Sequence, residues 1–310
     1  MLLIVGASGK LGFATLNALL DHKLIPANEI TCTTSSRTGA QKLKTAQAQG
    51  VHIVQANWDD DEETWQSVLA GCNTLFLISS SRIDKDFGDA PPGAGREADH
   101  IKVLSAAKGT GVVEHVYYTS LAFANPSRSR VMKAHERTEE WLATSNMRHT
   151  ILREGLYNES WPLYFGHYTV PDDDRGEVPI AGDSKISWTS IADLGLANAM
   201  ILSAPSEEWA GKTCCLAQGQ AYTLRDVAGM VSRARGKEVK VKMVAREEHE
   251  EYYARERGMP ESMVKWWSKT YDALRQGECE IHDPTLERLL ATKGVKPKPM
   301  EETVAEMLKV

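Results

Sequence analysis

Three glycines near the N-terminus have the spacing that binds a phosphate. Gly6, Gly9 and Gly12 lie in GASGKLG, which follows the apolar run 2–5 and leads into LGFATLNALL, whose apolar spacing predicts a helix. In such a strand, turn and helix, the glycines permit a tight turn, close backbone approach to a pyrophosphate and close helix packing. The helix N-terminus adds N–H donors and positive potential. We therefore expect a dinucleotide site, with a purely structural turn as the alternative.

The end of the second expected strand bears on which dinucleotide binds. A site for NAD places a carboxylate there to bind the ribose 2′-hydroxyl. This chain instead has TTSSRTG, with Arg37 and no carboxylate. The planar guanidinium matches a 2′-phosphate, and Ser35 or Ser36 adds a hydroxyl donor. The stretch predicts NADP(H), and the alternative is an ordinary surface arginine.

The rest of the N-terminal half alternates between strand-like and helix-like segments. Apolar runs recur at 29–36, 51–58, 74–81, 114–121 and 149–157, and helical patterns lie between them at 39–49, 61–71, 95–111 and 133–146. Each parallel strand connection needs a crossover, so this alternation predicts a doubly wound parallel sheet with helices on both faces, an α/β Rossmann-type fold.

The pattern loosens after about residue 155. A stretch rich in Pro, Gly and Asp follows, a helix is expected at 190–205 beginning near Ser190 or Asp193, and charged helices fill the C-terminal third. We expect a dinucleotide-binding domain at 1–156, with 184–204 returning to it. Residues 157–183 and 205–310 would form a smaller substrate-binding lobe.

Aromatic residues gather in the expected lobe. They either wall an apolar cleft for a planar substrate or form the core of the lobe. Trp266 and Trp267 are neighbours on one expected helix, so at most one of them should face a cleft. The two groups are Trp161, Tyr164, Phe165, Tyr168 and Trp188, and Tyr252, Tyr253, Trp266, Trp267 and Tyr271.

Composition excludes several classes of protein. The 310 residues are 42% hydrophobic and carry a net charge of −6, which argues against nucleic acid or anionic lipid as a direct partner. No apolar run approaches the roughly 20 residues that span a bilayer, so we expect a cytoplasmic protein with no membrane association. The five cysteines lack metal-ligand spacing, no metal site is expected, and Cys214 and Cys215 resemble strand residues.

Several motifs in order, GxxGxxG, Arg37, YYTSL, TEEWL, ILREGLYNE and DPTLERLLATKGVKPKPMEETV, together resemble the NmrA-like family of atypical short-chain dehydrogenases/reductases. The resemblance covers nearly the whole chain. It implies a Rossmann domain with a small C-terminal lobe and NADP(H) as cofactor. Some members of the family are reductases, including quinone and dye reductases, and others are redox-sensing regulators that bind the cofactor without turnover.

The resemblance also assigns residues to the cofactor. Arg37 would bind the 2′-phosphate together with Ser36, Asn57 would lie beside the adenine, and Ser79 and Ser80 would line the ribose and nicotinamide. The residues expected around the pyrophosphate are Gly6, Ala7, Ser8, Gly9, Lys10, Leu11 and Gly12.

The family's Tyr-x-Glu-Asn motif is matched in part. Tyr157 and Glu159 stand at its first and third positions and are expected at the cofactor, with Tyr157 shaping the nicotinamide pocket. Ser160 replaces the final Asn, which removes the support for a role of that residue.

The stretch RVMKAHERTEEW lacks the catalytic pair of conventional members, a Tyr four residues before a Lys. In those members a Glu often follows the Lys by four residues. If Glu139 is this Glu, the lysine position is His135 and the tyrosine position is Val131. Lys133 would lie on the solvent face of the helix. A histidine can donate to a ribose hydroxyl and, with an unperturbed pKa of about 6.5, can act as an acid near neutrality. The alternative is a core histidine bonded to a backbone carbonyl.

These observations leave two main functional hypotheses, beside a third, a pathway-specific isomerase or ring-forming enzyme that uses the same pocket. The first is an NADP(H)-dependent reductase of a small conjugated or aromatic substrate of the quinone type, since such an acceptor can take hydride without a tyrosine acid. The second is a regulator that senses the redox state of the dinucleotide and acts through a protein partner.

Overall fold

The computed structural model describes residues 1–123 and 125–309. Its centre is a seven-stranded parallel sheet with the order β10-β6-β5-β4-β1-β2-β3. Strand β1 lies inside this sheet, between β4 and β2, and is buried along its whole length. The strands are β1 (Leu2–Val5), β2 (Ile30–Thr34), β3 (His52–Gln55), β4 (Thr74–Leu77), β5 (His115–Leu121), β6 (His149–Glu154) and β10 (Thr213–Leu216).

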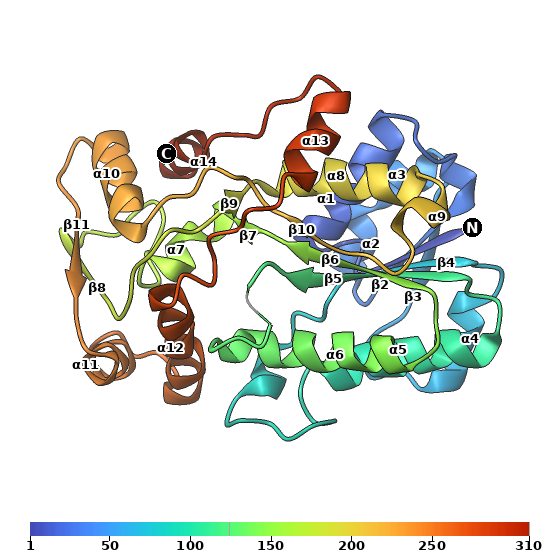
Figure 1. The fold of residues 1–310 in the computed structure, drawn as a ribbon, viewed down its shortest axis with the longest axis horizontal. Helices are drawn as coiled ribbons and strands as arrows, with labels where there is room; N and C mark the ends of the chain where they lie inside the picture. The colour runs from blue at the N-terminus through green and yellow to red at the C-terminus, as the bar shows by residue number, and fades with distance from the viewer. Residues whose placement is uncertain (124, 310) are drawn as a thin grey trace.

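Helices cover both faces of the sheet (Figure 1). One face carries α1 (Lys10–Asp21) and α8 (Ile191–Ser203), which pack against each other, and the other carries α4 (Glu62–Leu69), α5 (Glu97–Thr110) and α6 (Lys133–Thr144). Short helices α2 (Arg37–Lys42) and α3 (Lys44–Ala48) follow β2. The fold expected from the sequence, α/β with helices on both faces, is confirmed.

The alternation of side chains along β1 shows why two helical layers are needed. Leu2 and Ile4 belong to one buried apolar cluster, and Leu3 and Val5 belong to another. Successive side chains of a strand point to opposite faces, so an apolar residue at every position requires cover on both sides.

The C-terminal part forms a smaller lobe beside the carboxyl ends of the strands. A third apolar cluster fills it and contains Trp161, Trp188 and Tyr271. Its elements are β7 (Leu156–Tyr157), α7 (Trp161–Tyr164), β8 (Glu177–Ile180), β9 (Trp188–Thr189), α10 (Leu224–Arg235), β11 (Lys240–Met243), α11 (Arg246–Glu251), α12 (Glu261–Arg275) and α14 (Met300–Leu308).

The division between the two parts differs from the expected one at β10. This strand lies within 205–310, the range assigned to the lobe, but it is hydrogen-bonded to β6 at the edge of the main sheet. Helix α9 (Ser206–Trp209) precedes β10, and α13 (Thr285–Thr292) packs against α8 and β10. Cys214 and Cys215 are strand residues, as expected. None of the described helices has the length and apolar character to cross a bilayer.

Candidate active site

The candidate site lies along the edge of the sheet where the parallel strands end. Gly6 follows β1, Ser35 follows β2 and Asn57 lies two residues after β3. Leu121 ends β5 and Gly155 follows β6. Parallel strands bring their carboxyl ends to one edge, which is where α/β proteins bind ligands. Two cavities lie on this edge, one beside β1, β2 and β3 and the other beside β5 and β6.

The glycine turn between β1 and α1 has the shape that a bound phosphate requires. Gly6 has φ of +87°, which favours glycine, and Gly9 donates its N–H to the carbonyl oxygen of Gly6 at 3.0 Å. A Cβ on Gly12 would collide with that oxygen and lie 2.7 Å from Ile78 Cδ1 and 2.8 Å from the Cα of Ala7. The third position is thus closed to larger residues, as the sequence predicted.

The N-terminus of α1 is open to an anion. Gly9 is its N-cap, no side chain accepts from the first N–H groups, and the first turn has no acidic residue. Unpaired N–H groups and the helix dipole favour a negative group at this place. Lys10 is exposed beside it, whereas Ala7 and Leu11 are buried and pack in the core. The turn therefore fits a pyrophosphate, held by backbone rather than by side chains.

The smaller cavity, about 50 Å³, adjoins this turn. It brings together Gly6, Ser8 and Asn57 of the expected site. Asn57 takes part in a turn, since its amide donates to Asp60 at 2.7 Å and its oxygen accepts from the N–H of Asp59 at 2.9 Å. The remaining lining residues are Val5, Thr33, Thr34, Ser35, Ala56, Trp58 and Trp65.

Arg37 lies close to this cavity in the sequence, two residues after Ser35. It begins α2, and the hydroxyl of Ser36 caps this helix by accepting from the N–H of Gly39 at 3.0 Å. The Arg37 side chain is exposed and makes no ion pair with any described residue. An exposed guanidinium without a carboxylate partner remains available to a phosphate.

The larger cavity, about 210 Å³, is almost entirely apolar. Val131 lines it, so the position of the missing tyrosine faces this space as expected, and so does Leu121 at the end of β5. Tyr157 also lines it, and burial raises the pKa of its phenol well above the usual range, with further contributions from Glu154 and Glu159. The other lining residues are Ile83, Gly155, Leu156, Ser160, Leu163, Tyr164, His167, Met263, Trp266 and Trp267.

The expectation that only one of Trp266 and Trp267 faces the cleft is wrong. Both line the cavity, with ring centroids 6.3 Å apart. Neighbouring helical positions diverge by about 100°, but indole rings are large enough to border one space from two sides. Some of the aromatic residues wall a cleft and others only form the lobe core, so each interpretation holds in part. Tyr164, Trp266 and Trp267 border the cavity. Trp161 and Trp188 lie in the lobe core away from it.

His135 lies one helical turn beyond Val131 and does not line the cavity. It is 1% exposed, and its Nδ1 lies 3.0 Å from the hydroxyl of Tyr118. Burial, with the nearby charge of Arg96, lowers the pKa of His135 well below its ordinary value. The premise of the proton-donor role, a pKa of about 6.5, is therefore wrong for this environment. Lys133, at the solvent surface, pairs with Glu136 at 2.8 Å.

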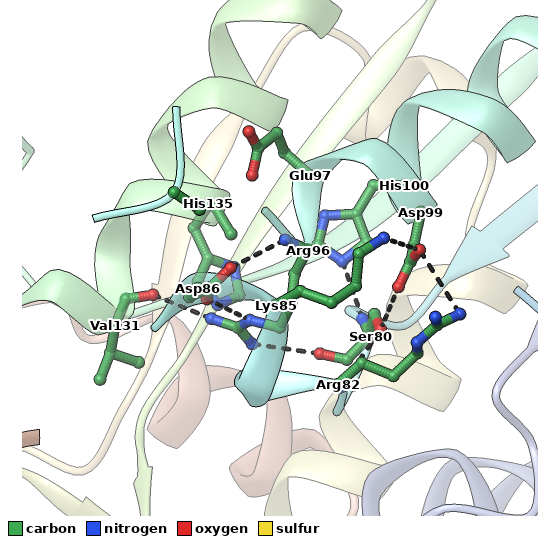
Figure 2. A network of polar contacts seen from close by, with 12 residues as sticks. Ser80, Arg82, Lys85, Asp86, Arg96, Glu97, Asp99, His100, Val131 and His135 are labelled. Carbon is green, nitrogen blue, oxygen red and sulfur yellow. Dashed lines mark hydrogen bonds and ion pairs between the residues drawn. The ribbon is translucent and has the colours of Figure 1, made fainter. Parts of the chain in front are cut away.

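Ser79 and Ser80 end up in different environments. Ser79 is half-buried, and its N–H donates to Thr119 Oγ1 at 3.0 Å. Ser80 is buried, and its hydroxyl donates to Asp99 at 2.8 Å, away from solvent (Figure 2). The backbone of Ser80 is engaged as well, because its N–H donates to His100 at 2.8 Å and its carbonyl accepts from Arg96 at 3.1 Å, so nothing in the structure supports a direct contact of Ser80 with a cofactor.

Glu159 accepts hydrogen bonds from the start of a neighbouring helix. Its carboxylate accepts from the N–H of Ile191, in the first turn of α8, at 3.2 and 3.3 Å. Burial raises the pKa of this carboxyl, against the opposing effect of that N–H and of Lys298 and Lys10. Ser160 replaces the final Asn of the family motif, so the resemblance assigns it no role, but it lines the larger cavity.

Sequence reasoning missed several residues of the site. Trp58 and Trp65 line the smaller cavity, and Ile83, Leu163, His167 and Met263 line the larger one. Of these residues, only Trp58 could have been predicted from the sequence, because it directly follows Asn57 at a strand end. Among the described residues, no group of His, Cys, Asp or Glu is arranged to hold a metal ion.

A parallel sheet with a glycine turn after its first strand, β1, and a cavity on either side of that turn defines a Rossmann-type dinucleotide-binding protein. Comparison with known proteins is more specific. The NmrA-like family model matches residues 1–296, and the chain belongs to this family.

Three comparisons give the extent of the likeness. Quinone oxidoreductase 2 of Escherichia coli is 34% identical over 239 residues, which cover 77% of this chain and 76% of that protein. The crystal structure of NADPH-dependent quinone oxidoreductase from Escherichia coli in complex with NADPH superposes with a TM-score of 0.81 at 29% identity, over 100% of both chains. The triphenylmethane reductase of Citrobacter sp., complexed with NADP(H), gives 0.80 at 28% identity, over 99% of this chain and 100% of that one.

Proposed function

We propose that this protein is an NADP(H)-dependent reductase of small conjugated or aromatic acceptors, with quinones as the substrate class. The observation that carries the proposal is the apolar cavity beside β5 and β6, on the same sheet edge as the glycine turn. A dinucleotide whose pyrophosphate sits at the turn, with its adenine in the smaller cavity, extends toward this larger one. The activities of the related quinone oxidoreductase and triphenylmethane reductase support the same class.

The size and lining of the cavity limit the acceptor. A cavity of about 210 Å³ exceeds the roughly 150 Å³ that holds a benzene ring and falls below the roughly 300 Å³ at which drug-sized pockets begin. Aromatic walls from Tyr164, Trp266 and Trp267 favour a flat ring. A substituted one- or two-ring quinone meets these limits.

The chemistry needs little from the side chains. A nicotinamide bound here would provide hydride chemistry toward an electron-poor carbon of a conjugated acceptor. The apolar residues position the acceptor and exclude water. Val131 offers no proton, and the phenol of Tyr157 stays neutral, so Tyr157 is a hydrogen-bond donor to a carbonyl oxygen rather than a base. The proton of the reduced product comes from solvent.

The preference for NADP(H) rests on Arg37, which is exposed, without an ion pair among the described residues, and next to the serines that follow β2. Ser36 contributes by capping the helix on which Arg37 stands. The glycine turn and Lys10 bind the pyrophosphate in this proposal, while Asn57 borders the adenine.

The test is NADPH oxidation with a panel of benzoquinones and naphthoquinones. We expect turnover that saturates with the quinone, and much slower turnover with NADH. Absence of turnover across the panel, with NADPH bound tightly, would overturn the reductase proposal. That result would favour the regulatory alternative, which Val131 at the tyrosine position also supports, and which further predicts similar affinity for oxidised and reduced cofactor.

A further inference from the structure

A buried chain of hydrogen bonds leads from the end of β4 to His135. We call Ser80, His100, Tyr118 and His135 the relay; each is at most 1% exposed. Figure 2 shows Ser80, His100 and His135. The N–H of Ser80 donates to Nε2 of His100 at 2.8 Å. The hydroxyl of Tyr118 lies 3.3 Å from Nδ1 of His100 and 3.0 Å from Nδ1 of His135.

The direction of the first bond fixes the proton of His100. A backbone N–H can only donate, so Nε2 of His100 is an acceptor and carries no proton. Burial, reinforced by Arg96, lowers the pKa of His100 well below its ordinary value, so the ring is neutral and its proton is on Nδ1. Thr138 Oγ1 lies 2.8 Å from Nδ1 and gives its own proton to the carbonyl of Ala134 at 2.7 Å. Thr138 can therefore accept from His100.

The second bond then fixes the proton of His135. Tyr118 cannot donate to Nδ1 of His100, because that nitrogen already carries a proton. Among the described residues, Nδ1 of His135 is then the acceptor nearest to the Tyr118 hydroxyl, at 3.0 Å. A buried hydroxyl without an acceptor costs about 1–3 kcal/mol, so Tyr118 donates to His135. A neutral His135 that accepts at Nδ1 carries its proton on Nε2.

Nε2 of His135 makes no hydrogen bond with any described residue, whereas its Nδ1 is engaged with Tyr118. His135 lies on the same helical face as Val131, one turn away, and Val131 lines the larger cavity. Arg96 fixes this helical turn through the carbonyls of Ser80 at 3.1 Å and Val131 at 3.0 Å, and it pairs with Asp86 at 2.6 Å (Figure 2).

We propose that the relay holds His135 in the Nε2–H tautomer, so that His135 offers a hydrogen-bond donor, and no acceptor, to an uncharged oxygen at the nicotinamide end of the site. That oxygen belongs to a ribose hydroxyl of the cofactor or to the carbonyl of the acceptor. Tyr118 and His100 are positioning residues that act through His135. The identity of the oxygen rests on the proposed reductase function, whereas the tautomer does not.

The direct test is ¹⁵N NMR of protein labelled in its histidines, with His135 assigned by comparison with His135→Gln. The wild type should show an unprotonated Nδ1 and a protonated Nε2 for His135 at neutral pH, and Tyr118→Phe should populate the other tautomer. Tyr117→Phe is the matched control, since Tyr117 is buried on the same strand but outside the relay. A protonated Nδ1 in the wild type would overturn the proposal, and this readout does not need turnover.

Binding and kinetics identify the oxygen. His135→Leu should weaken the relevant ligand by about threefold to tenfold, His135→Gln should restore part of the loss through its amide donor, and Tyr118→Phe should give a smaller loss. A change in the Kd for NADPH without quinone assigns the donor to the ribose, and a change confined to the KM for quinone assigns it to the acceptor. Unchanged values for both ligands in folded His135→Leu would refute the ligand contact. A correct tautomer in a protein without turnover would count only against the reductase proposal.

Discussion

The two ends of the site share one sheet edge but are built in opposite ways. The pyrophosphate end comes from one turn, residues 6–12, and acts through backbone N–H groups and a helix N-terminus. The larger cavity is assembled from segments as far apart as Ile83 and Trp267 and acts through apolar side chains. We therefore expect the first end to tolerate no change of backbone shape, and the second to accept changes residue by residue without loss of cofactor binding.

The strongest challenge to this contrast is Gly12→Val. The new Cβ would collide with the carbonyl of Gly6, and relief requires backbone movement in the turn. We expect NADPH affinity to fall by at least about 100-fold, or about 2.7 kcal/mol, in a calorimetric titration. Gly176→Ala is the control, since its Cβ would meet nothing nearer than Glu238 O at 3.8 Å. Wild-type affinity in Gly12→Val would disprove the role of the turn.

Arg37→Ala tests the one side chain on which we expect cofactor preference to depend. Loss of a charge-assisted contact with the 2′-phosphate should lower NADPH affinity by about 1.5–3 kcal/mol, roughly tenfold to 150-fold, and leave NADH affinity unchanged. The measurement is the Kd for each cofactor. Arg255→Ala, an exposed arginine of the lobe, controls for loss of a positive charge. An equal loss for both cofactors would contradict the assignment.

Val131→Phe tests whether the cavity can be altered alone. The larger ring would occupy space that the acceptor needs, so quinone kcat/KM should fall by about tenfold or more, whereas the Kd for NADPH should change by less than about twofold. Val112→Phe, at a position 44% exposed, is the control for added surface hydrophobicity. A parallel loss of NADPH affinity would show that the two ends are not separable.

His249→Phe gives the smallest effect and tests the lobe behind the cavity. Burial lowers the pKa of His249 to about 4. The unfolded chain takes up this proton near pH 6.5 but the folded chain does not, so the stability from neutral His249 is complete above about pH 6.5 and is lost as pH falls toward 4. As pH falls below about 6.5, the unfolding free energy of the variant should therefore decrease less steeply than that of the wild type, by up to about 1.4 kcal/mol per pH unit.

Urea unfolding at pH 7, 6 and 5 measures that slope. His22→Asn, at an exposed position that ends α1, should leave the slope unchanged. An unchanged slope in His249→Phe would mean that His249 takes up its proton equally in the folded and unfolded chains.

The predictable parts of this molecule depend on local signals. The glycine turn, the strands of the main sheet and the start of α8 at Ser190 each follow from a few contiguous residues, such as the hydroxyl of Ser190 that accepts from the N–H of Asp193 at 3.1 Å. The availability of Arg37 to a phosphate was predictable because its neighbours in TTSSRTG include no carboxylate. Val131 could be placed at the cavity because the helical register of α6 relates it to Glu139.

The unpredictable parts depend on contacts between distant segments. The low pKa of His135 requires the desolvation and the charge of Arg96 that only the folded chain provides. Glu159 caps a helix that begins 32 residues later, at Ile191. The place of β10 depends on pairing with β6, some 60 residues earlier in the chain. Neither the periodicity nor the composition of the sequence indicates such pairings.

The position of β10 also restricts how the site opens. The chain leaves the main sheet after β6, returns through α8 and β10, leaves again for α10 to α12, and returns once more at α13 before ending in the lobe at α14 (Figure 1). Motion about a single hinge would have to bend all of these connections together.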